Sequence, residues 1–161
     1  MIHNKRAYIG RFGGVYEHSP WVAELAFETG PPAPKDLPAA MRQIVADAGR
    51  DAQLTLLRAH PDLAGKLAKS GTLTSESTSE QASAGLDQCT DAEFAEFTDL
   101  NDRYKSRFGF PYILAVRGRN KDEILENFRC RIGNDPTVEF REALDQVHQI
   151  AALRLDVLLN G

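Results

Sequence analysis

Two residues of this sequence have surroundings that suggest chemistry, and His60 is the first. It stands before Pro61, and a residue before proline is disfavoured in the α region, so a helix should end near Ala59. The helix dipole at such an end favours the protonated imidazole. An ordinary pKa of about 6.5 would let His60 give or take a proton near neutrality. The alternative without catalysis is that His60 is a capping or surface histidine. His18 is a weaker candidate for the same catalytic role.

Arg154 is the second residue, because it interrupts an apolar stripe of the expected carboxy-terminal helix. Helical spacing places it between the stripe residues Phe140, Leu144, Val147, Ala151 and Leu158. A buried guanidinium requires an anion for its fork of donors. That anion could be a carboxylate of a neighbouring helix or an anionic substrate, and a stem that packs inward with its head in solvent is a further alternative.

Other site chemistries are poorly represented. The four histidines have no partner three or four residues away, so no metal site is expected. The segment Arg11–Gly14 lacks the Lys-Ser/Thr tail of a phosphate-binding loop, and there is no Gly-x-Ser-x-Gly nucleophile elbow, although a Ser-His-Asp triad stays open. Cys89 and Cys130 are too few for a metal framework and should be reduced thiols.

Helix start signals recur along the chain, whereas strand signals are scarce. They predict an all-α fold of about seven to eight helices in a single domain, residues 1–161. The expected starts are Ser19-Pro20 before Trp21–Glu28, Asp36 before a stripe of Met41, Ile44, Val45 and Ala48, the capping boxes Thr90–Glu93 and Asn120–Glu123, and Asp135-Pro136 before a helix that ends near Leu159.

Two segments are expected to lack regular structure. Thr74–Ser79 is rich in serine and threonine, which predicts a loop that caps a helix beginning near Glu80. Residues 110–116 are aromatic and β-branched, as in a strand, but no second strand is available for pairing. A buried extended connector is therefore expected, whose amides must find other acceptors, and lining a ligand pocket would be one use for them.

Composition narrows the class of protein. The chain has 161 residues, 42% hydrophobic and 26% charged, with a net charge of −4. These values are typical of a globular protein and argue against a nucleic-acid partner, which would require a row of lysines and arginines. Apolar runs are too short for a membrane span or a signal peptide, so a cytoplasmic location is expected.

Taken together, several motifs resemble the 2-oxo-4-hydroxy-4-carboxy-5-ureidoimidazoline (OHCU) decarboxylase family. Five stretches carry the resemblance in the same order, from about Phe12 to the end of the chain. They are residues 12–24 (FGGVYEHSPWVAE), 57–66 (LRAHPDLAGK), 73–81 (LTSESTSEQ), 108–116 (FGFPYILAV) and Arg154 in the final helix.

The resemblance implies an all-α, cofactor-independent and metal-free enzyme, usually a homodimer. It would release CO₂ from OHCU and form S-allantoin in urate degradation. Functional coupling to urate oxidase and hydroxyisourate hydrolase is a further expectation. By resemblance, His60 corresponds to the catalytic histidine, Glu80 to an essential carboxylate and Arg154 to the arginine that holds substrate. The expected substrate-binding residues are Pro61, Ser77, Thr78, Ser79, Gln81, Phe110, Ile113, Leu114, Ala115 and Val116.

Three functions are compatible with these residues. In the decarboxylase, Arg154 would clamp an anionic or carbonyl group, His60 would act as general acid or base, and Glu80 would orient His60 or act on the departing carboxylate. A non-catalytic helical interaction module would show no turnover and would expose an apolar groove. A hydrolase acting on a related ureide would use Glu80 and His60 to activate water and would release no CO₂.

Overall fold

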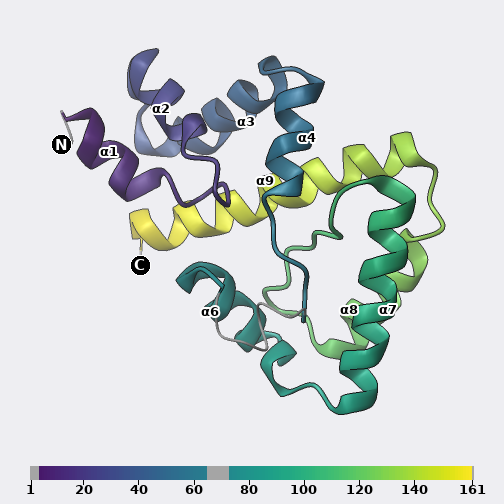
Figure 1. Ribbon diagram of the computed structural model, residues 1–161. Helices are drawn as coiled ribbons and strands as arrows, with labels where there is room; N and C mark the ends of the chain where they lie inside the picture. The colour runs from purple at the N-terminus through teal and green to yellow at the C-terminus, as the bar shows by residue number, and fades with distance from the viewer. Residues whose placement is uncertain (1–3, 65–72, 161) are drawn as a thin grey trace. The chain divides into compact units, whose positions relative to one another are not determined.

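The computed structural model describes residues 4–64 and 73–160, and these residues are helical without any strand (Figure 1). The predicted all-α class is confirmed. The eight α-helices described are α1 (Lys5–Phe12), α2 (Trp21–Glu28), α3 (Leu37–Asp47), α4 (Arg50–Arg58), α6 (Ser75–Ser83), α7 (Asp91–Phe108), α8 (Lys121–Arg131) and α9 (Pro136–Asn160), with short 3-10 helices η1 (Pro34–Asp36) and η2 (Leu86–Gln88). Within the described ranges, no helix has the length and apolar character to cross a membrane.

The chain contains two compact units. The first comprises Met1–His60 and Val147–Gly161, and the second comprises Pro61–Gln146. One boundary lies between His60 and Pro61, and the other lies inside α9. The expected single domain stays a prediction.

The first unit contains α1 to α4 and the carboxyl part of α9. Neighbouring helices pack in chain order, α1 with α2, α2 with α3 and α3 with α4, as the purple to blue ribbon shows (Figure 1). Their apolar faces form a core in which Met41, Val45, Leu56 and Leu57 are at most 1% exposed. Gly49 has a φ of 91°, a conformation that favours glycine, and it turns the chain between α3 and α4.

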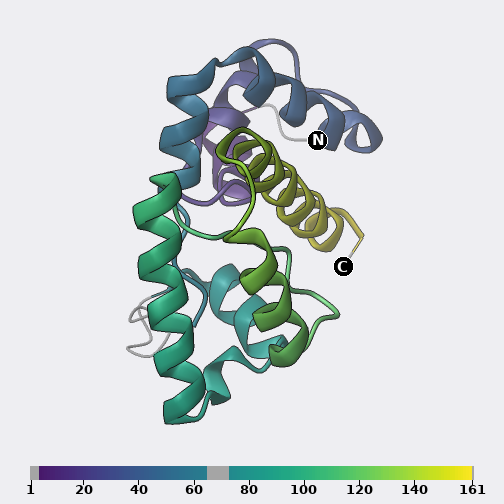
Figure 2. The ribbon, with the colours of Figure 1, turned by 90° about the vertical axis from the view of Figure 1, so that its right-hand side faces the viewer.

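The second unit contains α6, η2, α7, α8 and the amino part of α9. Helices α7 and α8 lie side by side, and α6 contacts η2 (Figure 2). Aromatic rings fill the core of this unit. Tyr112 stacks on Phe128 with centroids 3.8 Å apart, and the ring of Tyr104 contacts both of them edge-on.

Local helix signals correctly located several starts. The side chains of Thr90 and Asn120 form the two predicted capping boxes with Glu93 and Glu123. The backbone amide of Thr137 donates to the carboxylate of Asp135 at the start of α9.

Three predictions about helix starts and one about a loop need correction. Helix α2 has the predicted bounds, but Ser19 does not cap it, because its hydroxyl donates to the carbonyl of Glu17 at 3.1 Å. Asp36 precedes α3 without a capping hydrogen bond from its side chain. The predicted loop Thr74–Ser79 and the predicted helix start near Glu80 are both wrong, since α6 begins at Ser75. Thr74 is the true cap and accepts a hydrogen bond from the amide of Ser77.

Two stripe residues are also more exposed than predicted. Ala48 is exposed beyond the end of α3, and Leu158 is 39% exposed near the end of α9. Phe140, Val147 and Ala151 are buried as expected, with Leu144 half-buried.

The buried extended connector is confirmed for residues 110–116, all of which are buried and without helix or strand. Side chains replace the missing ladder. The amide of Ala115 donates to the side-chain oxygen of Gln146 at 3.0 Å, and the carbonyl of Ile113 accepts from Arg131 at 2.5 Å.

Candidate functional site

His60 follows the carboxyl end of α4 in the first unit. Its amide donates to the carbonyl of Leu57 at 3.2 Å, which continues the last turn of the helix beyond Ala59. The residue is buried, with 8% of its surface exposed. Its Nε2 atom is buried and has no hydrogen-bond partner among the described residues. Within residues 4–64 and 73–160, Nη2 of Arg131, Oδ1 of Asn101 and the hydroxyl of Tyr8 are also buried without a hydrogen-bond partner, so this feature marks His60 as one candidate for contact with a ligand and does not by itself assign a function.

The pKa of His60 differs from the sequence-based expectation. The pKa of His60 is lowered to about 4, chiefly because the side chain is buried. The carboxylate of Glu17 opposes this shift, whereas Arg154 and His18 add to it. The predicted preference for the protonated form is therefore wrong. The loss of hydration around the imidazolium outweighs the helix dipole, so His60 is neutral at pH 7.

Arg154 is buried on α9, and its guanidinium is bound within the first unit. Its Nη2 donates to Oε2 of Glu17 at 2.8 Å, and its Nη1 donates to the carbonyl of Gly14 at 2.9 Å. Arg154 therefore has an intramolecular anionic partner, but the carboxylate belongs to the loop between α1 and α2 and not, as one alternative had predicted, to a neighbouring helix. Arg154 is also close enough to His60 to change its pKa. A direct role of Arg154 with substrate stays a prediction.

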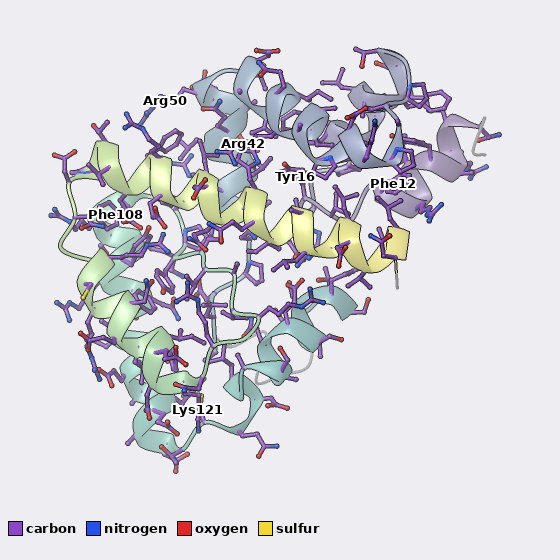
Figure 3. All side chains as sticks on the ribbon, turned by 180° about the vertical axis from the view of Figure 1, so that it is seen from behind. Phe12, Tyr16, Arg42, Arg50, Phe108 and Lys121 are labelled. Carbon is purple, nitrogen blue, oxygen red and sulfur yellow. The ribbon has the colours of Figure 1, made fainter. Side chains whose placement is uncertain are left out.

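Glu17 is the residue that sequence reasoning did not single out. Its side chain is only 1% exposed, and its Oε1 lies 3.8 Å from Nε2 of His18. The loop that carries Glu17 also contains Tyr16, which Figure 3 labels. The loop is held against α9, because the hydroxyl of Tyr16 forms a hydrogen bond with Nδ1 of His148 at 2.8 Å. The sequence around Glu17 did not indicate a buried carboxylate, because its burial depends on contacts with α9, which is distant in the sequence.

The predicted site residues around Glu80 belong to α6 in the second unit. Ser77 and Gln81 are buried on one face, four residues apart, and Glu80 is half-buried. Thr78 and Ser79 are exposed. Helical geometry therefore separates the five predicted residues into a buried pair, an intermediate carboxylate and two exposed hydroxyls.

Gln81 binds the segment that follows His60 in the chain. Its side-chain oxygen accepts a hydrogen bond from the amide of Ala64 at 2.9 Å, and its Nε2 donates to the carbonyl of Asp62 at 3.4 Å. Ala64 has a φ of 50°, which is unusual for a residue with a side chain. Asn101 holds the same segment by donating to the carbonyl of Leu63 at 3.0 Å. Residues 61–64 are thus fixed by side chains of α6 and α7.

Pro61 itself is half-buried at the start of that segment. The predicted residues Phe110 and Ile113–Val116 lie in the buried connector, in the same unit as α6. Gly65 and Lys66 of the motif at 57–66 and His3 lie outside the described residues. Whether the predicted substrate-binding residues contact substrate stays a prediction.

A second buried charge cluster supports the connector. Nε of Arg131 donates to Oε1 of Glu139 at 2.6 Å, and the hydroxyl of Tyr104 donates to the same oxygen at 2.7 Å. Asn134 donates to the other oxygen at 3.0 Å. The guanidinium also lies over the ring of Tyr112 at 4.6 Å. This cluster was not predicted from the sequence. Its contacts join the side chains of α7, α8 and α9 within the second unit, which indicates a structural role.

Metal ligands do not cluster in the described part of the chain. No group of three histidine, cysteine or acidic side chains has the geometry to hold an ion there.

Comparisons with known proteins identify the family of this chain. The family model for OHCU decarboxylase matches residues 3–156. The 2-oxo-4-hydroxy-4-carboxy-5-ureidoimidazoline decarboxylase of Haloferax volcanii is 45% identical over 150 residues, which cover 92% of this chain and 87% of that protein. The uric acid degradation bifunctional protein PucL of Bacillus subtilis is 39% identical over 144 residues, which cover 89% of this chain and 28% of that protein.

A solved structure has the same fold. The crystal structure of OHCU decarboxylase in the presence of (S)-allantoin matches with a TM-score of 0.75 and 25% identity, covering 91% of this chain and 96% of that one. Because the family model extends across nearly the whole sequence, this chain belongs to the OHCU decarboxylase family.

Proposed function

We propose that this protein removes CO₂ from OHCU to form (S)-allantoin, with His60, Arg154 and Glu80 as the residues that carry the reaction. The activity is that of the family to which this chain belongs, the OHCU decarboxylases of urate degradation. The observation that supports a catalytic His60 is its buried Nε2, which has no partner among the described residues and lies in the same unit as the Arg154–Glu17 pair.

The chemistry makes limited demands on the protein. The bond between the ring carbon and the carboxylate breaks, CO₂ leaves, and the electron pair moves into the conjugated ring. A proton is then added to one face of the ring, which decides the handedness of the product. The protein must orient the carboxylate, stabilise the developing charge and deliver the proton to one face.

A neutral imidazole is suited to remove the proton of the substrate hydroxyl, which the substrate must lose as well as CO₂. With its pKa lowered to about 4, His60 enters the reaction able to accept a proton from the substrate hydroxyl. The substrate carboxylate would then stabilise the imidazolium, because an opposite charge nearby favours the charged form. His60 could return the proton in the later step. A positioned acid–base group of this kind contributes about 10²–10⁴-fold.

Arg154 and Glu80 are proposed to act on the charged parts of the substrate. Arg154 would bind an anionic or carbonyl group from a position fixed by Gly14 and Glu17. Glu80 would orient His60 or place its charge near the departing carboxylate. The substrate-binding roles proposed for α6 and for residues 110–116 are supported by the family match, which includes both segments.

The deciding experiment follows product handedness. Urate, urate oxidase and hydroxyisourate hydrolase generate OHCU in the cuvette, and circular dichroism detects one-handed allantoin. We expect the protein to give a strong signal together with CO₂ release. A racemic product at the uncatalysed rate would contradict the proposal, and a ureide product without CO₂ would indicate a hydrolase instead.

We also propose that the protein is a cytoplasmic homodimer and is functionally coupled to the two enzymes that supply OHCU. The coupling is supported by the match to a bifunctional protein of uric acid degradation. Light scattering of the purified protein tests the dimer. Cell fractionation tests the location, and a change in allantoin yield on mixing with the hydrolase at limiting urate tests the coupling.

A further inference from the structure

Glu17 combines three features that the proposed chemistry does not yet use. It is a carboxylate with a side chain only 1% exposed, it binds the guanidinium of Arg154 at 2.8 Å, and it acts on His60 electrostatically. A buried ion pair is weak evidence of a stability role, because desolvation of both charges offsets their attraction. The pair therefore calls for a functional explanation.

Several hydrogen bonds fix the loop that carries Glu17. Tyr16 anchors the loop to His148 of α9, and Arg154 binds the carbonyl of Gly14 from the same helix. The next residue, His18, has a φ of 51°, which is uncommon for a side-chain-bearing residue and is often found at functional sites. The hydroxyl of Ser19 donates to the carbonyl of Glu17 and closes the turn.

We propose that Glu17 is a positioning residue of the decarboxylation. Its carboxylate holds the guanidinium of Arg154 in place, and its negative charge acts electrostatically on His60. This inference rests on the proposed function of His60 and Arg154. It differs from a purely structural role, because it predicts that the charge of Glu17, and not only its shape, controls the reaction.

The charge of Glu17 has a defined consequence for His60. The groups that act on the imidazole are Glu17, which favours its protonated form, and Arg154 and His18, which disfavour it. Without the carboxylate, Arg154 and His18 would still disfavour the protonated imidazole, and no nearby charge would oppose them. The imidazole would then be a weaker base in the reaction.

The test compares Glu17→Gln with Glu17→Asp in the full chain. Gln keeps the size and one acceptor for Arg154 but removes the charge. We expect kcat/KM to fall about 10- to 100-fold, as for other displaced positioning groups. The acid limb of the kcat–pH profile should move to lower pH by about one unit, because an opposite charge near His60 is lost. Asp restores the charge, so its acid limb should match that of the parent.

Glu24→Gln is the matched control, since Glu24 belongs to the same unit but forms a half-exposed ion pair with Lys5 at 3.0 Å. An unchanged acid limb in Glu17→Gln would overturn the proposal, even if that variant melted at a lower temperature. If Glu17→Gln does not fold, Glu17→Asp decides: its shorter side chain should lower kcat/KM at least tenfold, and parental kcat/KM would overturn the proposal. Absence of turnover in the parent protein would instead show that the proposed function has failed.

Discussion

Arg131 and Glu139 form a buried ion pair, with Nε of the arginine 2.6 Å from Oε1 of the glutamate. The same guanidinium binds the carbonyl of Ile113 in the extended connector. One side chain therefore neutralises a charge on α9 and also holds the backbone of a segment that has no ladder.

Arg131→Met should be strongly destabilising, because it leaves the carboxylate of Glu139 buried without its cation. Loss of one partner of a buried pair costs about 3–5 kcal/mol. Arg129→Met is the matched control two residues away, since its pair with Glu96 is half-exposed and should contribute at most about 1 kcal/mol. Urea unfolding followed by circular dichroism measures both. Equal losses in the two variants would contradict the importance of the buried cluster.

Gln81→Leu should destabilise the segment that follows His60. The amide of Ala64 would lose its acceptor, which costs about 1–3 kcal/mol for a buried group. The exposed Gln88→Leu makes the same chemical change as a control. Hydrogen exchange should show faster exchange at Ala64 in the first variant only. Unaltered protection of that amide would mean that Gln81 does not hold the segment.

His60→Asn should abolish most turnover while the protein stays folded. Loss of a positioned acid–base group lowers kcat by about 10²–10⁴-fold. His18→Asn replaces a 63% exposed side chain nearby and should lower kcat much less. The measurement is the formation rate of one-handed allantoin. A His60→Asn variant with parental kcat would remove His60 from the mechanism.

Arg154→Lys should weaken substrate handling and stability together. Lysine keeps the positive charge but cannot reproduce the two directed hydrogen bonds to Gly14 and Glu17. We expect a raised KM or a lower kcat, with a lower melting temperature. If only the melting temperature changes, the arginine serves the ion pair alone and does not act on substrate.

Acid should destabilise the protein through His60. Its pKa is about 4 in the folded protein, below the ordinary value of 6.5. Above pH 6.5 the imidazole is neutral in both states, so its contribution to stability is fully present. As the pH falls from about 6.5 toward 4, the unfolded chain binds a proton that the folded protein does not, and the free energy of unfolding decreases.

The His60→Asn variant isolates this effect from the titration of carboxylates. The free energy of unfolding, measured by urea denaturation at several pH values, should fall less steeply for the variant than for the parent across this range. Parallel slopes for the two proteins would show that His60 has an ordinary pKa in the folded state.

The parts of the fold that the sequence predicts correctly depend on close neighbours in the chain. The capping boxes at Thr90 and Asn120 require only a glutamate three residues later. The connector at residues 110–116 was predictable because an apolar, β-branched segment had no second strand to pair with. Serine-rich α6 was missed because its composition resembles a loop, although Thr74 caps it and only Ser77 and Gln81 need to be buried.

The candidate site was predictable only in part. Proline after His60 and the gap in an apolar stripe at Arg154 marked two residues that the structure places in one unit. The lowered pKa of His60 could not be predicted, because burial arises from tertiary packing and exceeds the local helix dipole. Glu17 was missed for the same reason, since its partner Arg154 is 137 residues away in the sequence.

The connector at residues 110–116 also changes how its backbone can be disturbed. The amide of Ala115 and the carbonyl of Ile113 rely on side chains from α9 and α8, not on neighbouring backbone. A substitution at Gln146, more than thirty residues away, can therefore alter the connector while every residue within it stays the same. In this protein the conformation of one short segment depends on side chains of two helices that are distant in the sequence. Mutations outside the segment can therefore disturb it as much as mutations within it.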